Sequence, residues 1–223
     1  MSLPTSRYVV VTGTDTSVGK TVVTAALAVA LEAAGRRVAV VKPAQTGVGP
    51  DEPGDIAAVV ALTGLTHVHE LARLDLPLAP ESAARAVGAP LPTISDHARA
   101  IRAIDADIIV IEGAGGLLVR LDLDGGTIRD LALELDAEVV LVAREGLGTL
   151  NHVALTMAAL AQVGLAAHVV LGSCSADPGL AERSNRADIP RLTGAPLLGL
   201  VPEGSGALAA NRFRALAPGW FTP

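Results

Sequence analysis

The segment from Thr12 to Thr21 reads TGTDTSVGKT and directly follows the apolar run Tyr8–Val11. A loop that holds phosphates needs glycines where backbone amides turn inward, a lysine that reaches the β and γ phosphates, and a hydroxyl for Mg²⁺. The segment supplies these parts as Gly13, Gly19, Lys20 and Thr21. The first glycine stands one residue farther from the Gly-Lys-Thr triplet than in the usual spacing, so the loop is a variant.

We interpret this segment as a phosphate loop that binds a nucleoside triphosphate. The alternative is a turn that caps an ordinary helix, but the preceding hydrophobic strand and the alanine-rich helix predicted over Thr21–Ala34 favour the phosphate loop. We expect contacts to the nucleotide all along the loop, from Gly13, Thr14, Asp15, Thr16, Ser17, Val18, Gly19, Lys20, Thr21 and Val22.

Length and composition narrow the class of protein. A chain of 223 residues can bury one sizeable core, and we expect a single domain over residues 1–223. No apolar run approaches the roughly 18 residues of a membrane span, and the N-terminus lacks the features of a signal peptide, so we expect no membrane association. The lone Cys174 cannot form an internal disulfide, which favours the cytoplasm. The net charge of -6 and the 2% aromatic content argue against nucleic acid as a partner.

Short β-branched runs alternate along the chain with helical patterns. Strands are predicted at Tyr8–Val11, Val38–Val41, Ile108–Ile111, Val139–Val142, His168–Leu171 and Leu197–Val201. Helices are predicted at Thr21–Ala34, Asp55–Leu62, Ser95–Ile104, Ile128–Leu135 and Asn151–Val163. This alternation predicts an α/β fold of the P-loop NTPase type, with a doubly wound, mostly parallel sheet flanked by helices. We expect a surface excursion over residues 65–92 with a short helix near Pro80–Val87, and one short helix with a loose end after Gly206.

Ligands of open parallel sheets bind outside the carboxyl ends of the strands, where two further motifs lie. One of them, EGAGG, begins with Glu112, at a place where phosphate-loop proteins carry an acid that helps to hold Mg²⁺. The alternative for Glu112 is an ion pair with a lysine. The glycines of this motif, Gly113, Gly115 and Gly116, would allow a substrate to approach closely.

The other motif, KPAQTG, begins with Lys42. A lysine at a strand end is usually solvated, but here Lys42 can stabilise the charge that develops during phosphoryl transfer, and Thr46 can add a hydroxyl. Farther along, Asp55 precedes a predicted helix. Its position is equally compatible with a helix cap and with a metal ligand.

The segment REGLGTLNH opens another predicted helix after a strand. Free amides at a helix start bind carboxylates or phosphates, so an anionic end of a substrate could dock at Gly148 and Thr149. The alternative is that Thr149 or Asn151 caps its own helix. We interpret the five histidines as surface residues, because they show no metal-ligand spacing, and Cys174 as non-catalytic, because no base stands beside it in the sequence.

Together, TGTDTSVGKT, KPAQTG, EGAGG and GLGTLNH resemble, in this order and over almost the whole chain, the dethiobiotin synthetases. The resemblance implies a homodimeric enzyme of the biotin pathway that uses ATP, CO₂ and Mg²⁺ to close a ureido ring on 7,8-diaminononanoate. It implies that Thr21, Asp55 and Glu112 hold the metal, and that Lys20, Lys42 and Thr46 surround the transferred phosphoryl group. It also implies substrate contacts, those at the helix start being supplied partly by the other subunit, from Thr16, Lys42, Thr46, Gly115, Gly148, Thr149, Leu150 and Asn151.

The chain departs from the family pattern in two places. Relatives often place an asparagine that reads adenine after the strand at His168, whereas this chain has Gly172-Ser173-Cys174-Ser175. We therefore expect backbone contacts to the base near Gly172, Ser173 and Pro202, and acceptance of nucleoside triphosphates other than ATP. Relatives also commonly carry a glutamate where Ser17 stands, so we expect no acidic role at that position.

Other classes of protein share such a core. Partition and targeting ATPases or GTPases usually carry a further lysine five positions before the loop lysine, where this chain has Asp15. Glutamine-dependent ligases need a glutaminase domain, for which this chain has no room. A protein that binds nucleotide without turning over any diamine is a third alternative.

Overall fold

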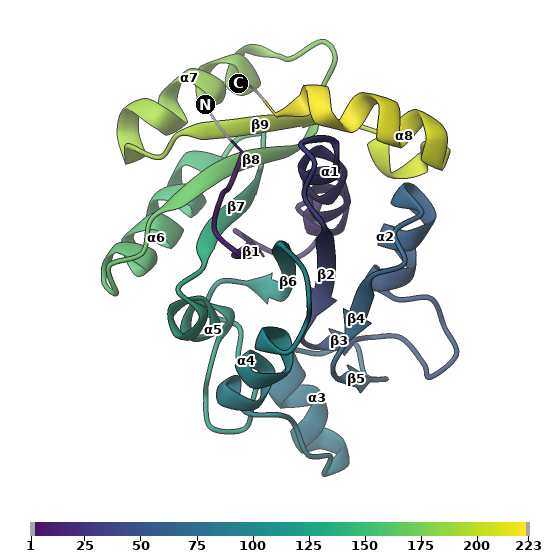
Figure 1. Ribbon diagram of the computed structural model, residues 1–223. Helices are drawn as coiled ribbons and strands as arrows, with labels where there is room; N and C mark the ends of the chain where they lie inside the picture. The colour runs from purple at the N-terminus through teal and green to yellow at the C-terminus, as the bar shows by residue number, and fades with distance from the viewer. Residues whose placement is uncertain (1–2, 222–223) are drawn as a thin grey trace.

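The computed structural model describes residues 3–221, so the ends of the predicted domain, Met1, Ser2, Thr222 and Pro223, lie outside the described residues. Its centre is a seven-stranded sheet in the order β4-β2-β6-β1-β7-β8-β9 (Figure 1). The strands are β1 (Tyr8–Gly13), β2 (Val38–Lys42), β4 (Val68–Glu70), β6 (Ile108–Gly116), β7 (Glu138–Arg144), β8 (Ala167–Cys174) and β9 (Leu197–Pro202). Neighbouring strands of this sheet pair in parallel, and β1 lies between β6 and β7. The sheet is therefore doubly wound, as the alternation of strands and helices predicts.

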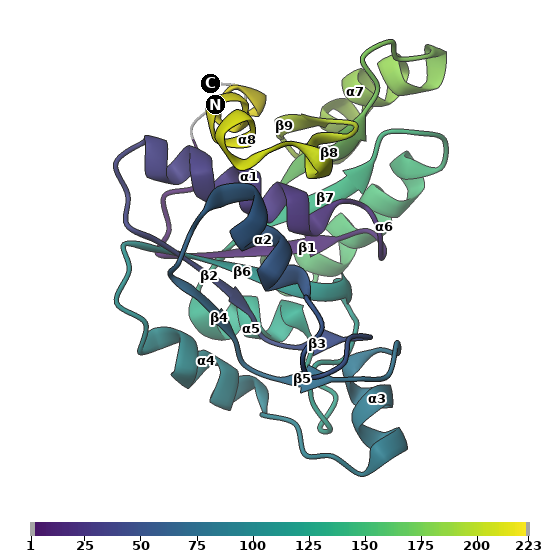
Figure 2. The ribbon, with the colours of Figure 1, turned by 90° about the vertical axis from the view of Figure 1, so that its right-hand side faces the viewer.

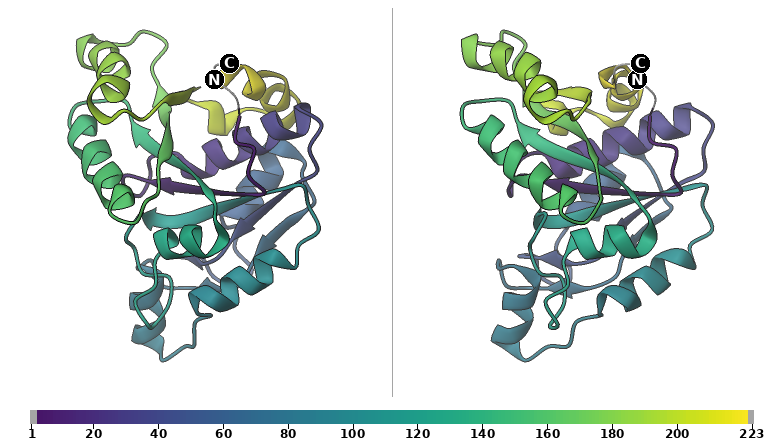
Figure 3. Two further views of the ribbon diagram at one scale, coloured as in Figure 1. Left: turned by 60° about the vertical axis from the view of Figure 1, so that its left-hand side comes forward. Right: turned by 90° about the vertical axis from the view of Figure 1, so that its left-hand side faces the viewer.

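Helices cover both faces of the sheet. The helices are α1 (Lys20–Ala33), α2 (Asp55–Thr63), α3 (Pro80–Val87), α4 (Ile94–Arg102), α5 (Ile128–Leu135), α6 (Thr149–Ala161), α7 (Leu180–Thr193) and α8 (Ala210–Leu216). Val9 and Val11 of β1 face the layer formed by α1, α2 and α8 (Figure 2). Val10 faces the layer formed by α4, α5, α6 and α7 (Figure 3). Because both faces are buried, the strands read as continuous apolar runs without alternation.

The least readable part of the sequence, residues 65–92, contributes to the sheet. Val68 pairs with Val40, which makes β4 an edge strand, so the prediction of a surface excursion is wrong for this strand. The strands β3 (Gln45–Thr46) and β5 (Arg73–Leu74) form a separate two-stranded sheet. The short helix predicted at Pro80–Val87 is present as α3.

The C-terminal part is ordered in more detail than the sequence predicts. The helix α7 was not predicted, because its sequence is polar and its buried residues among those described are Asn185 and Ile189. After β9 come the 3₁₀ helix η1 (Ser205–Ala207), α8 and the 3₁₀ helix η2 (Ala217–Trp220). Phe221 bridges to Gly199 of β9, so the described tail is packed onto the sheet and is not loose. No helix in residues 3–221 is long and apolar enough to cross a membrane.

Candidate active site

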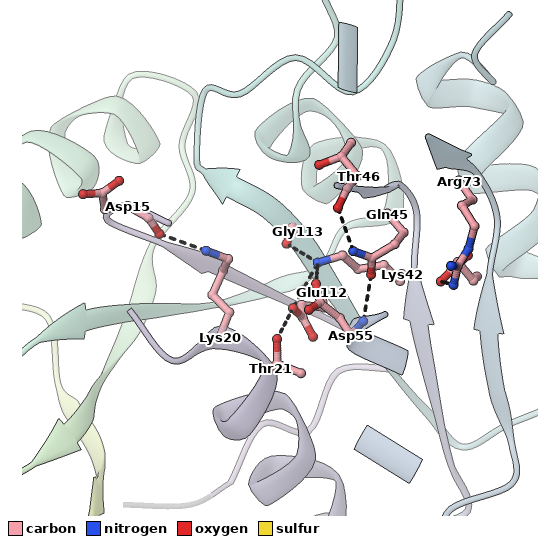
Figure 4. Close-up of polar contacts among 11 residues, drawn as sticks. Asp15, Lys20, Thr21, Lys42, Gln45, Thr46, Asp55, Arg73, Glu112 and Gly113 are labelled. Carbon is pink, nitrogen blue, oxygen red and sulfur yellow. Dashed lines mark hydrogen bonds and ion pairs between the residues drawn. The ribbon is translucent and has the colours of Figure 1, made fainter. Parts of the chain in front are cut away.

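The sheet order places the three strand-end motifs side by side. Because β6 lies between β2 and β1, Glu112 stands between Lys42 and the phosphate loop that leaves β1 (Figure 4). The carboxyl ends of these parallel strands meet at one edge of the sheet, which is where ligands of such sheets bind. A cavity of about 540 Å³ opens at this edge. Its lining includes Thr16, Lys20, Thr21, Lys42, Gln45, Thr46, Asp55, Glu112 and Gly115.

The phosphate loop is shaped by its small residues. Gly19 has a φ of 95° and directly precedes α1, a left-handed conformation that glycine adopts at little cost. A Cβ on Gly13 would lie 2.8 Å from the Asp15 carbonyl oxygen and 2.9 Å from a methyl of Val18, so the loop closes tightly over this position. Nζ of Lys20 donates a hydrogen bond of 2.9 Å to the Asp15 carbonyl oxygen. The loop lysine is thus folded back onto its own loop.

Lys42, Asp55 and Glu112 form an ion cluster beside the loop. Nζ of Lys42 lies 2.5 Å from Oδ2 of Asp55 and 3.0 Å from Oε1 of Glu112. It also donates a hydrogen bond of 3.0 Å to the Gly113 carbonyl oxygen. The hydroxyl of Thr21 donates to the same Oε1 of Glu112 at 2.8 Å. The side chains of Lys42 and Glu112 are 3% and 1% exposed, so this pair is screened from water, whereas the side chain of Asp55 is 35% exposed at the edge of the cluster.

The cluster shifts the protonation of its members. Burial alone would lower the pKa of Lys42, but the carboxylates of Glu112 and Asp55 outweigh it and hold the pKa above its ordinary value. Burial opposes ionisation of Asp55, and Lys42 overcomes it, so the pKa of Asp55 is lowered. Burial raises the pKa of Glu112. Burial and the neighbouring Lys42 lower the pKa of Lys20.

The residues present fit a divalent cation that is shared with phosphates. Oε2 of Glu112 is buried and has no hydrogen-bond partner, which leaves an unsatisfied acceptor at the cluster. Two carboxylates and a hydroxyl are oxygen ligands of the kind that Mg²⁺ prefers when phosphates and water complete its shell. Among residues 3–221, no group of three or more His, Cys, Asp or Glu forms an all-protein metal site.

The structure excludes the helix-cap alternative at two helix starts. Gly54 is the N-cap of α2, and no side chain caps that helix, so Asp55 is free to face Lys42. Gly148, with a φ of 89°, is the N-cap of α6, and neither Thr149 nor Asn151 caps it. Oγ1 of Thr149 is buried without a hydrogen-bond partner. The segment from Gly148 to Asn151 does not line the cavity at the phosphate loop.

The predicted base contacts lie apart from the ion cluster. Gly172 and Ser173 line a separate cavity of about 330 Å³, which also includes Ser17 and Val18 of the phosphate loop. Ser17 and Ser173 both have left-handed backbones, with φ of 55° and 56°, which is uncommon for serine. Pro202 ends β9 and lines neither this cavity nor the one at the ion cluster.

Sequence reasoning missed two residues that position the site. The side chain of Gln45, in the KPAQTG motif, accepts a hydrogen bond of 2.8 Å from the backbone amide of Asp55 and so fixes the start of α2. Arg144, at the end of β7, forms an ion pair of 3.1 Å with Asp15 of the phosphate loop. The composition contains a signal for the site as a whole but not for these two residues: the chain has two lysines, Lys20 and Lys42, and both line the cavity at the ion cluster.

Two predictions about reactive side chains have different outcomes. His97 is fully buried on the inner side of α4, so its prediction as a surface residue is wrong. Its neighbours Ala98 and Ile101 are also buried, which shows that the amphipathic face of α4 includes the histidine. Cys174 is buried, and burial raises the pKa of its thiol to about 12, in agreement with the prediction that it is not catalytic.

The fold and the loop define a P-loop nucleotide-binding protein. A family model described as an AAA domain matches residues 7–207. The chain is 56% identical over 215 residues to the ATP-dependent dethiobiotin synthetase BioD of Rhodococcus jostii, covering 95% of this chain and 93% of that protein. It is 52% identical over 217 residues to the enzyme of the same name from Streptomyces coelicolor, covering 96% and 91%. The chain belongs to the family of ATP-dependent dethiobiotin synthetases.

Solved structures show the same fold in more distant proteins. The septum site-determining protein MinD from Pyrococcus horikoshii superposes with a TM-score of 0.60 at 20% identity, covering 96% of this chain and 90% of that one. A ParA family ATPase from Chlorobium tepidum superposes with a TM-score of 0.56 at 16% identity, covering 95% and 92%. At such identities the likeness concerns the fold alone.

Proposed function

We propose that this enzyme, an ATP-dependent ligase of the biotin pathway, forms dethiobiotin from 7,8-diaminononanoate, CO₂ and ATP with the help of Mg²⁺. The observation that carries the proposal is the cluster of the buried Lys42 and Glu112 with the partly exposed Asp55 beside a phosphate loop. The cluster sets positive and negative groups next to the place where a γ-phosphate would lie. Phosphoryl transfer depends mainly on such positioning and on electrostatic stabilisation.

The shape of the site suits a substrate with a polar head and a long alkyl chain. Thr16, Thr46 and Gly115 line both the polar cavity and a second cavity of about 510 Å³. Most of the other lining residues of the second cavity are apolar, and they include Pro77 and Leu78. The two amines of a diamino acid would face the ion cluster, and its methylene chain would lie along the apolar walls.

The chemistry follows from the product. One amine and CO₂ form a carbamate, whose oxygen attacks the γ-phosphorus of ATP, and ADP leaves with the electrons of the broken bond. The neighbouring amine then attacks the carbonyl carbon of the mixed anhydride, phosphate leaves and the ureido ring closes. Lys20 and Lys42 would stabilise negative charge on the phosphoryl oxygens, and Thr46 would hold the carbamate end by its hydroxyl.

Thr21, Asp55 and Glu112 would hold the magnesium ion. When bound, the ion would offset negative charge on the β and γ phosphates. The unpartnered Oε2 of Glu112 supports this assignment, because it is a buried acceptor that a metal ion would satisfy while Oε1 accepts from Lys42 and Thr21.

We also propose that two copies of the single domain 1–223 assemble into a homodimer. Leu118, Leu147 and Leu155 are 55%, 90% and 62% exposed, and Leu118 and Leu155 border the same surface groove. Burial of such leucines between two copies would be favourable. In the dimer, the helix start from Gly148 to Asn151 would face the partner's cavity and receive the substrate carboxylate.

We call the cavity lined by Ser17, Val18, Gly172 and Ser173 the base pocket. It would accept other nucleoside triphosphates besides ATP. Gly172 has no side chain, and Ser173 is exposed at the position that follows it. A serine hydroxyl cannot pair with a donor and an acceptor of one base as an amide side chain does, so direct selection of adenine would be weak here. Backbone groups near Gly172, Ser173 and Pro202 would contact the base.

The test is phosphate release in the presence of 7,8-diaminononanoate, bicarbonate, Mg²⁺ and each nucleoside triphosphate in turn. Release that requires both the diamine and bicarbonate is the expected result. Equal phosphate release without the diamine would instead support the alternative of a regulatory ATPase or GTPase of the partition or targeting type. No release with any nucleotide would contradict the proposed reaction.

A further inference from the structure

The ion cluster uses the groups that the proposed metal site needs. Oε1 of Glu112 accepts hydrogen bonds from Nζ of Lys42 at 3.0 Å and from the hydroxyl of Thr21 at 2.8 Å. Oδ2 of Asp55 lies 2.5 Å from the same Nζ. The Lys42 ammonium therefore stands between the two carboxylates and offsets their negative charge.

Lys42 cannot pair with the two carboxylates and stabilise a phosphoryl group at the same time. Its ammonium has three protons, and Asp55, Glu112 and the Gly113 carbonyl oxygen accept from it. Held in this way, it has no proton left for a phosphoryl oxygen. A divalent cation at the same carboxylates would repel the ammonium and take over its partners.

We propose that the Lys42 ammonium is a stand-in for the metal ion in the nucleotide-free enzyme, and that it leaves Asp55 and Glu112 for the phosphoryl end of the cavity when Mg²⁺ and nucleotide bind. This exchange rests on the metal site of the proposed function. It keeps both carboxylates, of which Glu112 is buried, paired in both states, and it makes the catalytic position of Lys42 depend on the metal. If nucleotide bound without Mg²⁺, Lys42 would still be paired with Asp55 and Glu112 and would not contact the phosphates.

The two-lysine composition allows a direct test. In protein labelled with ¹⁵N at the lysine side chains, the spectrum contains ammonium signals from Lys20 and Lys42 alone. Nucleotide added with a chelator should shift the Lys20 signal and leave that of Lys42 in place. Addition of Mg²⁺ with a non-hydrolysable nucleotide should then move the Lys42 signal. A Lys42 signal that ignores the metal, or that moves fully with nucleotide alone, would overturn the exchange.

A pair of matched variants provides a second test in the absence of nucleotide. Lys42→Met removes the competing ammonium, so Mg²⁺ should bind the variant about tenfold or more tightly than the wild type. Lys20→Met makes the same chemical change in the same cavity, but Lys20 bonds to the Asp15 carbonyl oxygen and not to the carboxylates. Because Lys20 interacts electrostatically with Glu112 and Asp55 without bonding to them, Lys20→Met should raise the Mg²⁺ affinity clearly less than Lys42→Met does. Equal Mg²⁺ affinity of Lys42→Met and the wild type would refute the proposal.

These tests separate the exchange from the overall reaction. They contain no diamine and no bicarbonate, so they do not depend on the formation of dethiobiotin. If Lys42→Met does not fold, the labelled wild-type protein still decides the question. If the Lys20 signal fails to respond to any nucleotide, the phosphate-loop assignment fails, and with it the proposed function.

Discussion

Gly172 is expected to set the position of the phosphate loop, and Gly172→Ala tests this. A Cβ at this position would overlap the Val18 carbonyl oxygen of the loop, well inside the 3.0 Å that real Cβ atoms keep. A second neighbour, a methyl of Val142, would lie 3.4 Å away and leaves little room for the added carbon to turn aside. The methyl group must therefore push the phosphate loop away from β8.

The size of the effect follows from the packing. Overpacking of a well-filled site costs about 1–3 kcal/mol. If nucleotide binding must restore the original loop position, this range corresponds to a loss of about 5- to 150-fold in kcat/KM for the nucleotide. Because Gly172 and Val18 also line the cavity proposed for the base, kcat/KM should fall for every nucleotide, by an amount that can differ between ATP, CTP and GTP.

The assay is steady-state turnover with each nucleotide, and Gly146→Ala is the control. Gly146 borders the same cavity, but a Cβ there would meet its nearest neighbour, an oxygen of Glu182, only at 3.9 Å. The control should retain wild-type kinetics. If Gly172→Ala also keeps a wild-type kcat/KM, the tight approach of β8 to the loop has no functional role and the reasoning fails.

Other predictions concern turnover, assembly, base choice and pH. Lys42→Met should lower kcat by about 10²- to 10³-fold while nucleotide still binds, and near-normal turnover would remove Lys42 from the catalytic residues. Leu155→Asp should convert a dimer to monomers in light scattering and lower diamine turnover; an unchanged mass would argue against this interface. The kcat/KM values for ATP and CTP should agree within about tenfold, and a strong preference for ATP would contradict the open base pocket. Burial lowers the pKa of His97 although Asp122 and Asp96 oppose it, so as the pH falls below 6.5 the unfolded chain binds the proton first and stability decreases. His97→Leu should show a smaller decrease in urea midpoint than the wild type, and an equal decrease would assign the effect to other groups.

The fold was predictable because the informative signals are local. Apolar runs such as Val38–Val41 are buried on both faces, and each is followed by a helix pattern, which leaves few arrangements besides a doubly wound sheet. The rule that ligands bind at the carboxyl ends of parallel strands is by itself enough to predict that Lys42 and Glu112 lie near the phosphate loop. The helix α7 was not predicted, because its sequence is mostly polar and shows no hydrophobic periodicity that would indicate a helix.

The details of the site depended on contacts that sequence spacing does not encode. The approach of Asp55 to Lys42 requires Gln45 to hold the amide that begins α2, and this is a contact across ten residues of irregular chain. The burial of His97 follows from the packing of α4 against α5 and not from the polarity of the side chain. The substrate contact proposed for Gly148 to Asn151 would need a second copy of the chain, since this segment does not line the cavity at its own phosphate loop.

The most direct test of the central claim follows the carbon atom of the new ring. The enzyme would be incubated with ¹³C-bicarbonate, 7,8-diaminononanoate, Mg²⁺ and ATP, and both the released phosphate and the mass of the organic product would be measured. The account predicts dethiobiotin that carries one ¹³C atom, formed in an amount equal to the phosphate. Phosphate released without labelled dethiobiotin would contradict it.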